Sequence, residues 1–306
     1  MSNRTDVLIV GGGASGLLAA IRASERGNRV ILLEKNDRPG RKLLASGNGR
    51  CNLMNSGTLR YYGDPAFANR VFDHCPFSRL QDFWEKYGLC LHKDQEGRVY
   101  PVTFQSTSVL SVLKTAIRIA GVDLRMNQRV TEIRSFSDFF RIYTSCGCEY
   151  EAKEVLIACG GAAQPALGGT MDGYHLLRSL GHTILPVFPA LVSMNADSRS
   201  ISGFSGTRAH CRVSLYEDET LLHEETGEAL FTDYGVSGIC VMQCARFARD
   251  RKTHLEICFL YDVFDNEAQA VDELKRRRTL FRGESPTALL EGIVPSKISF
   301  GILKQA

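Results

Sequence analysis

The segment VLIVGGGASGLLAAI, residues 7–21, decides the fold. Four apolar residues, Val7 to Val10, run directly into a cluster of glycines, as in a strand that is buried on both faces of a parallel sheet. Apolar residues then recur at helical spacing from Leu17 to Ile21. A second predicted strand, residues 29–33, follows and ends at Glu34. The sequence therefore predicts a β-α-β unit over residues 7–34.

The glycines of this unit are spaced as in dinucleotide-binding proteins, because Gly11, Gly13 and Gly16 stand in G-x-G-x-x-G register. The first glycine would permit the tight turn, the second the close approach of a pyrophosphate, and the third the packing of helix on strand. N–H groups at the start of the helix, at Ala14 and Ser15, would face the phosphate charge. These five residues are candidate cofactor ligands.

An acid at the end of the second strand strengthens this interpretation. Glu34 stands 18 residues after Gly16, where a carboxylate can accept hydrogen bonds from a ribose diol, and Lys35 follows it. A lone glycine motif is often only a turn, but a preceding buried strand and a following acid make it specific. NAD and FAD share the ADP half, so these residues do not separate the two cofactors.

The segment RPGRKLLASGNGRCN, residues 38–52, bears on that choice. A simple dehydrogenase would soon turn into another plain α/β crossover, whereas this loop is basic and rich in glycine. Arg41 and Lys42 could lie over the phosphates, and Gly47 and Gly49 could bring N–H groups to a large planar ring. The alternative is a surface loop rich in turn residues.

Residues 40–53 resemble the signature of a bacterial family of FAD-dependent oxidoreductases that includes a bile-acid 3-dehydro-Δ4,6-reductase and an aminoacetone oxidase. The resemblance continues in order along most of the chain, at residues 97–101, 109–113, 121–122, 155–161, 172–174, 181–182, 189–192, 227–232 and 235–238. It implies FAD as the cofactor and NADH or NADPH as the electron donor. It also implies cofactor contacts from Arg41, Lys42, Ser46, Gly47, Gly49, Arg50, Cys51, Asn52, Val130 (through its main chain to the adenine), Ala158 and Gly160. For Gly160 an ordinary β-α turn is an equal alternative.

The chain is expected to be α/β, with a Rossmann-like FAD-binding domain, an antiparallel β domain and the start of a helical insertion. We place these domains at residues 1–189, 190–264 and 265–306, because short alternating runs begin near residue 190 and helical, basic sequence follows residue 265. Within the first domain we expect a helix over 109–119 and, at the end, a strand pair over 139–144 and 150–152 closed by a separate strand over 154–158.

Composition favours a small-molecule substrate. The 306 residues carry 37 basic and 34 acidic side chains, which gives a net charge of +3. A protein that neutralises many phosphates usually has a larger excess of basic residues. The basic run at residues 275–278 is predicted to be a solvated helix face, with RNA binding as the minority alternative. No stretch approaches the ~20 apolar residues of a membrane span, and the N-terminal run is too short for a signal peptide, so we expect a cytoplasmic protein.

Ten cysteines are spread along the chain without a C-x-x-C pair, and 146/148 and 240/244 are the only close pairs. We expect them to be reduced thiols that act mainly as small apolar residues. Arg50 could lower the pKa of Cys51, but a thiol that packs or lines the cofactor is favoured. The seven histidines show no ligand spacing, so no metal site is predicted, and no catalytic acid or base can be named.

The resemblance implies that longer members of the family return after the insertion with a late glycine-rich segment that completes the flavin site, and residues 1–306 do not include such a segment. The predicted function is that of an FAD-dependent oxidoreductase that reduces an activated C=C bond, an enone, with NAD(P)H. One alternative is a flavin amine oxidase of the aminoacetone type. A second is a catalytically weak nucleotide-binding module.

Overall fold

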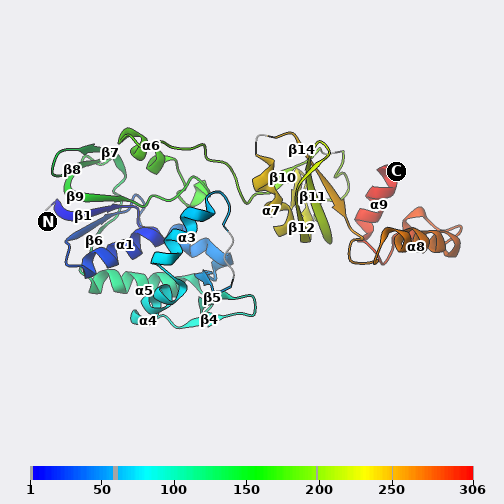
Figure 1. Ribbon diagram of the computed structural model, residues 1–306, viewed down its shortest axis with the longest axis horizontal. Helices are drawn as coiled ribbons and strands as arrows, with labels where there is room; N and C mark the ends of the chain where they lie inside the picture. Colours follow the sequence, from blue (N-terminus) through cyan, green and yellow to red (C-terminus); the bar gives the residue numbers. More distant parts are fainter. Residues whose placement is uncertain (1–2, 58–60, 198, 250, 306) are drawn as a thin grey trace. The chain divides into compact units, whose positions relative to one another are not determined.

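The computed structural model describes residues 3–57, 61–197, 199–249 and 251–305. Its contacts divide the chain into two compact units, Met1–Leu185 and Pro186–Ala306. The three domains expected from the sequence stay a prediction. Their outer ends, at residues 1–2 and 306, lie outside the described residues. Each unit is described here by itself (Figure 1).

A six-stranded mixed sheet forms the centre of the first unit. Its strands, in order across the sheet, are β6 (Asp123–Arg125), β2 (Val30–Leu33), β1 (Arg4–Val10), β9 (Glu149–Ile157), β8 (Phe140–Thr144) and β7 (Val130–Ser135). Strand β1 pairs in parallel with β2 and with β9, and β6 is parallel to β2. Strands β7 and β8 extend the sheet in antiparallel fashion. The predicted Rossmann-like α/β fold is thereby confirmed.

Helices cover both faces of this sheet (Figure 1). On one face α1 (Ala14–Glu25) and α5 (Ser106–Ile119) pack against alternate residues of β1 and β2, including the fully buried Ile9 and Leu32. On the other face Leu8 and Val10 join a cluster that includes Leu176 of α6 (Asp172–Ser179). Because consecutive strand residues point to opposite faces, the continuous apolar run of β1 supplies both cores.

Strand β9 takes the place of two separate strands that the sequence analysis expected at 150–152 and 154–158. It runs unbroken from Glu149 to Ile157, pairing with β8 through its first half and with β1 along most of its length. No glycine or proline interrupts residues 149–157, so nothing in the backbone ends the strand at Lys153. The antiparallel hairpin and the parallel core strand are therefore one element.

The basic loop after β2 folds into a short helix, α2 (Arg41–Ala45), followed by a 3₁₀ turn at Ser46–Gly49. Gly47 and Asn48 of this turn have positive φ, which a glycine adopts at little cost. Other elements of this region are β3 (Met54–Asn55), α3 (Pro65–His74), α4 (Phe77–Lys86), β4 (Leu91–Lys93), β5 (Arg98–Pro101) and a 3₁₀ turn at Pro165–Leu167. Strands β3, β5 and β4 form a separate small sheet.

The second unit contains a five-stranded antiparallel sheet. Its strands, in order, are β10 (Met194–Asn195), β13 (Gly235–Ser237), β12 (Thr220–Phe231), β11 (Arg208–Glu217) and β14 (Thr253–Cys258). A helix that the sequence analysis did not expect, α7 (Ile239–Ala248), contributes Val241 and Cys244 to the same core as this sheet. The predicted helical segment is present as α8 (Glu267–Leu280), a 3₁₀ turn (Pro286–Leu289) and α9 (Ser296–Gln305). Across the described parts of the chain, every helix falls short of the length and apolar character that a bilayer crossing needs.

Candidate dinucleotide-binding site

A cavity of about 540 Å³ opens in the first unit at the carboxyl ends of β1, β2 and β9. Ligands of doubly wound sheets bind at this edge, and the volume lies within the range of small-molecule and cofactor sites. The predicted residues that line it are Gly11, Gly13, Ala14, Ser15, Glu34, Lys35, Arg41, Lys42, Ser46, Cys51, Asn52, Val130, Ala158 and Gly160. The fold thus brings most of the candidate ligands to one place.

The three glycines of the motif differ in what surrounds them. Gly11 has a φ of +113°, and a Cβ there would lie 2.5 Å from the carbonyl oxygen of Ala158. A Cβ on Gly16 would overlap the carbonyl oxygen of Gly11, so this residue serves the packing of helix on strand and does not line the cavity. At Gly13 a Cβ would have no neighbour within 4 Å. The open space is therefore at the residue expected to face a pyrophosphate.

Helix α1 starts at this open space. Gly13 is its N-cap, and within the described chain no side chain caps that end. The first N–H groups of a helix have no partner inside the helix and carry the positive end of its dipole. Residues Ala14 and Ser15 line the cavity here, so this wall suits an anion.

Glu34 is held in a fixed orientation at the end of β2. The side chain is only 6% exposed. Oε2 accepts a hydrogen bond from the N–H of Gly12 at 2.7 Å, and Oε1 accepts from the backbone N–H and the Nδ2 of Asn36 at 2.8 and 2.6 Å. Since each carboxylate oxygen has two lone pairs, the group keeps acceptor capacity toward the cavity. Its position thus fits the recognition of a sugar diol.

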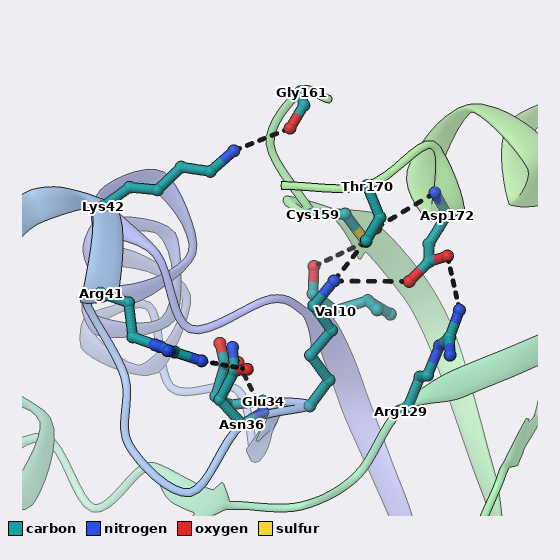
Figure 2. A network of polar contacts seen from close by, with 11 residues as sticks. Val10, Glu34, Asn36, Arg41, Lys42, Arg129, Cys159, Gly161, Thr170 and Asp172 are labelled. Carbon is teal, nitrogen blue, oxygen red and sulfur yellow. Dashed lines mark hydrogen bonds and ion pairs between the residues drawn. The ribbon is translucent and has the colours of Figure 1, made fainter. Parts of the chain in front are cut away.

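Three of the cations that line the cavity are predicted cofactor ligands, and Figure 2 shows contacts of Arg41 and Lys42. Lys42 donates to the carbonyl oxygen of Gly161 at 2.7 Å, and Arg41 donates to Oδ1 of Asn36 at 3.0 Å. Lys35 donates to the hydroxyl of Thr170 at 3.0 Å. Burial and then the charge of Lys35 lower the pKa of Lys42. Cations partly removed from water attract an anionic ligand more strongly than exposed ones do.

An ion pair that the sequence analysis missed closes one side of the cavity. Asp172, at the start of α6, accepts from Arg129 at 2.9 Å (Figure 2). It also lies 3.5 Å from the ammonium of Lys35. Burial alone would raise the pKa of Asp172, but hydrogen bonds from Arg129 and Thr170 and the two positive charges outweigh it, and the pKa lies below its usual value. The pair ties α6 to the strand that carries Val130.

Only some residues of the segment 46–52 line the cavity. Ser46, Cys51 and Asn52 line the cavity, while Gly47, Gly49 and Arg50 do not. Within the 3₁₀ turn, a Cβ on Gly47 would lie 2.9 Å from the backbone nitrogen of Asn52, so this glycine is needed by the turn itself. Cys51 is 3% exposed and burial raises the pKa of its thiol, which fits a packing residue and not a nucleophile.

Several residues of the cavity wall were not anticipated: Asn36, Trp84, Gln128, Arg129, Cys159 and Asp172. Arg129 directly precedes the predicted ligand Val130, and Asp172 begins the stretch 172–174 that resembles the family. The sequence therefore carried a signal for these two residues. Trp84 comes from α4, and nothing in its local sequence relates it to the glycine motif. Among residues whose placement is described, no three His, Cys, Asp or Glu side chains gather as metal ligands.

Comparisons with known proteins agree with this geometry. The family described as "HI0933-like protein Rossmann domain" matches residues 5–288. The 3-dehydro-bile acid delta(4,6)-reductase of Clostridium scindens is 38% identical over 243 residues, which are 78% of this chain and 59% of that protein. The ribosomal RNA dihydrouridine synthase of Escherichia coli is 27% identical over 258 residues, 80% of this chain and 61% of that protein. Thus the chain spans about three-fifths of the length of these curated relatives.

Among solved structures, that of Thermovibrio ammonificans THI4 aligns over 79% of each chain with a TM-score of 0.40 and 14% sequence identity.

Proposed function

Because the chain belongs to the HI0933-like protein family, we propose that it binds FAD in the cavity of the first unit and acts in an FAD-dependent oxidoreductase. The observation that carries the proposal is the convergence on one cavity of an uncapped helix start, a buried ribose-type carboxylate and four cations. An anion and a diol are the features that such a wall would recognise together, as in the pyrophosphate and ribose of a dinucleotide.

The proposed contacts follow the cavity wall. The N–H groups of Ala14 and Ser15 and the open space at Gly13 would receive the pyrophosphate, with Lys42 nearby as a counter-charge. Glu34 would accept hydrogen bonds from the ribose, and the main chain of Val130 would border the adenine. The residues of 46–52 that reach the cavity would lie toward the flavin end.

When bound, FAD supplies the hydride chemistry, and the chain's residues bind, orient and shield it. We propose that the acceptor is a C=C bond conjugated to a carbonyl, and that NADH or NADPH is the donor. Support comes from the name of the Clostridium scindens relative, a Δ4,6-reductase of 3-dehydro-bile acids, since a 3-oxo group with a 4,6-diene is a conjugated enone. The carbonyl makes the remote alkene carbon electrophilic, so hydride addition there is feasible.

The first test is the visible absorption spectrum of the purified chain after incubation with FAD and gel filtration. Retained FAD near one equivalent supports the proposal, and a colourless chain that cannot be loaded overturns it for these 306 residues. A Glu34→Ala variant should lose most of the retained cofactor. Glu154→Gln, which alters an exposed acid of the same sheet, should retain as much as the wild type.

Turnover separates the proposed activity from its alternatives. In the absence of oxygen, an enone reductase oxidises more than one equivalent of NADH or NADPH only when the enone is added. An amine oxidase consumes oxygen with an amine and needs no nicotinamide. A chain that retains FAD yet shows neither reaction is a nucleotide-binding module.

A second candidate substrate is a uracil base in RNA, and the Escherichia coli relative favours it. The C5=C6 bond of uracil is also conjugated to a carbonyl, so the same chemistry would make dihydrouridine. Against it, three of the four basic residues at 275–278 form ion pairs with Asp272 or Glu273 on the same helix. Salt-dependent binding of the chain to ribosomal RNA, with NAD(P)H-dependent loss of uracil absorbance, would establish this candidate over the small-molecule enone.

A further inference from the structure

The hairpin between β8 and β9 brings two thiols together on the surface. Cys146 and Cys148 are separated by Gly147, whose φ is +81°, and their sulfur atoms are 3.5 Å apart. The turn is closed by backbone hydrogen bonds from Gly147 to the carbonyl of Thr144 at 3.0 Å and from Thr144 to that of Cys148 at 3.1 Å. Since the two sulfur atoms are in contact, both side chains leave the turn on the same side.

The surroundings differ for the two sulfurs. Cys146 is exposed, and its sulfur lies 3.2 Å from the buried hydroxyl of Thr144 and 3.3 Å from Oε1 of Gln128. Hydrogen bonds from the Thr144 hydroxyl, the Cys148 N–H and the Cys148 thiol lower the pKa of Cys146 to about 7. The hydrogen bond to Cys146, and then burial, raise the pKa of Cys148.

Further contacts involve Gln128, the side chain that lies next to the sulfur of Cys146. Gln128 also accepts a hydrogen bond from the hydroxyl of Tyr150 at 3.0 Å, and the guanidinium of Arg125 lies over the Tyr150 ring at 5.2 Å. Burial raises the pKa of Tyr150, so this hydroxyl stays protonated beside the thiols at neutral pH. The hairpin thus holds one thiol with a lowered pKa next to one with a raised pKa.

We propose that Cys146 and Cys148 form a dithiol–disulfide site that reacts with low-molecular-weight disulfides. The geometry supports it through the sulfur contact, the exposure of Cys146 and the fixed turn. The proposed exchange needs no FAD, so its failure would leave the proposed function standing.

The chemistry balances in two exchanges. The thiolate of Cys146 attacks one sulfur of the reagent RS–SR, which forms a Cys146–SR mixed disulfide and releases RS⁻. Cys148 then loses its proton and attacks the Cys146 sulfur, which forms the Cys146–Cys148 disulfide and releases a second RS⁻. The two protein thiols lose two electrons, and the reagent is reduced to two thiols.

The first exchange is expected to be only moderately fast. At pH 7 about half of a thiol with pKa 7 is ionised, against about 3% for an ordinary cysteine, which is about a 16-fold advantage. Lower basicity makes the thiolate about fivefold less nucleophilic, so the net gain is about threefold. The identity of the product is a better test of the proposed site than the rate of the first exchange. The second exchange is intramolecular, so it should be faster than reaction with a second molecule of reagent.

The test treats the reduced full chain with glutathione disulfide at pH 7, followed by acid quench, alkylation and peptide mapping by mass spectrometry. The peptide that spans 146–148 should lose two hydrogens and carry no glutathione. In Cys148→Ser, glutathione should stay on Cys146, and in Cys146→Ser the link should be absent. Cys90→Ser, which removes another exposed thiol, should leave the link unchanged.

An internal control comes from Cys240 and Cys244, which are close in sequence but buried and should react only in urea. The proposal is overturned if wild-type chain keeps glutathione on Cys146 without forming the link. It is equally overturned if Cys90 is modified while Cys146 and Cys148 both remain thiols, or if the oxidised product is a disulfide between two chains on a non-reducing gel.

Discussion

Replacing Glu34 by glutamine tests how the carboxylate at the end of β2 is held. Both of its oxygens accept hydrogen bonds from N–H donors, Gly12 on one side and Asn36 on the other, and the side chain is almost fully buried. Glutamine has one acceptor oxygen and one NH₂ donor, so on one side a donor would face a donor. The variant therefore loses at least one charge-assisted hydrogen bond and leaves a buried N–H unsatisfied.

The cost follows from these two terms. A hydrogen bond to a charged group contributes about 1.5–3 kcal/mol, and an unsatisfied buried donor costs about 1–3 kcal/mol, with overlap between the two. We expect Glu34→Gln to lower the free energy of unfolding of the first unit by about 2.5 kcal/mol. With an m-value of about 2.5 kcal/mol/M, the urea midpoint should fall by about 1 M.

The assay is urea unfolding of the cofactor-free chain, followed by the fluorescence of its single tryptophan, Trp84, which belongs to the first unit. The matched control is Glu154→Gln on the exposed part of β9, which should stay within about 0.5 kcal/mol of wild type. Equal midpoints for the two variants would refute the reasoning, because the donors at Gly12 and Asn36 would then not depend on the carboxylate. This result would not bear on whether the chain binds FAD.

Three further outcomes are expected. Gly16→Ala should destabilise the first unit by about 3 kcal/mol in urea unfolding, since its Cβ would overlap backbone, whereas Gly13→Ala should fold normally and weaken FAD retention alone. Asp172→Asn should flatten the loss of stability below about pH 4: the folded pKa is depressed, so the carboxylate stabilises above its unfolded pKa and that contribution disappears as the pH falls. Unfolding midpoints of variant and wild type between pH 7 and pH 3 check this, and parallel curves would contradict it. Gly301→Ala should lower the thermal midpoint of the second unit, because its Cβ would overlap the ring of Phe204; an unchanged midpoint would show that the ring moves aside at no cost.

Local sequence was sufficient for the first strand, the first helix and the acid that follows them. An apolar run, glycines at fixed intervals and a helical spacing of leucines are properties of consecutive residues, and they dictate backbone angles and burial without reference to the rest of the chain. The positive φ of Gly11 and the tight packing at Gly16 are physical reasons for glycine at those positions. The fold class and the expected ribose-binding acid could therefore be derived before any tertiary structure.

Tertiary structure alone decided which distant residues share the cavity and the hairpin. Asp172 meets Arg129 and Lys35 only because α6 returns across the sheet beside β7. The pairing of β9 with both β1 and β8 shows that it is one strand, which the sequence analysis had divided into two. The contact of Cys146 with Gln128 likewise depends on strand register. The physical reason is that sequence patterns encode local conformation and burial, whereas register and helix placement are set by the packing of the whole unit.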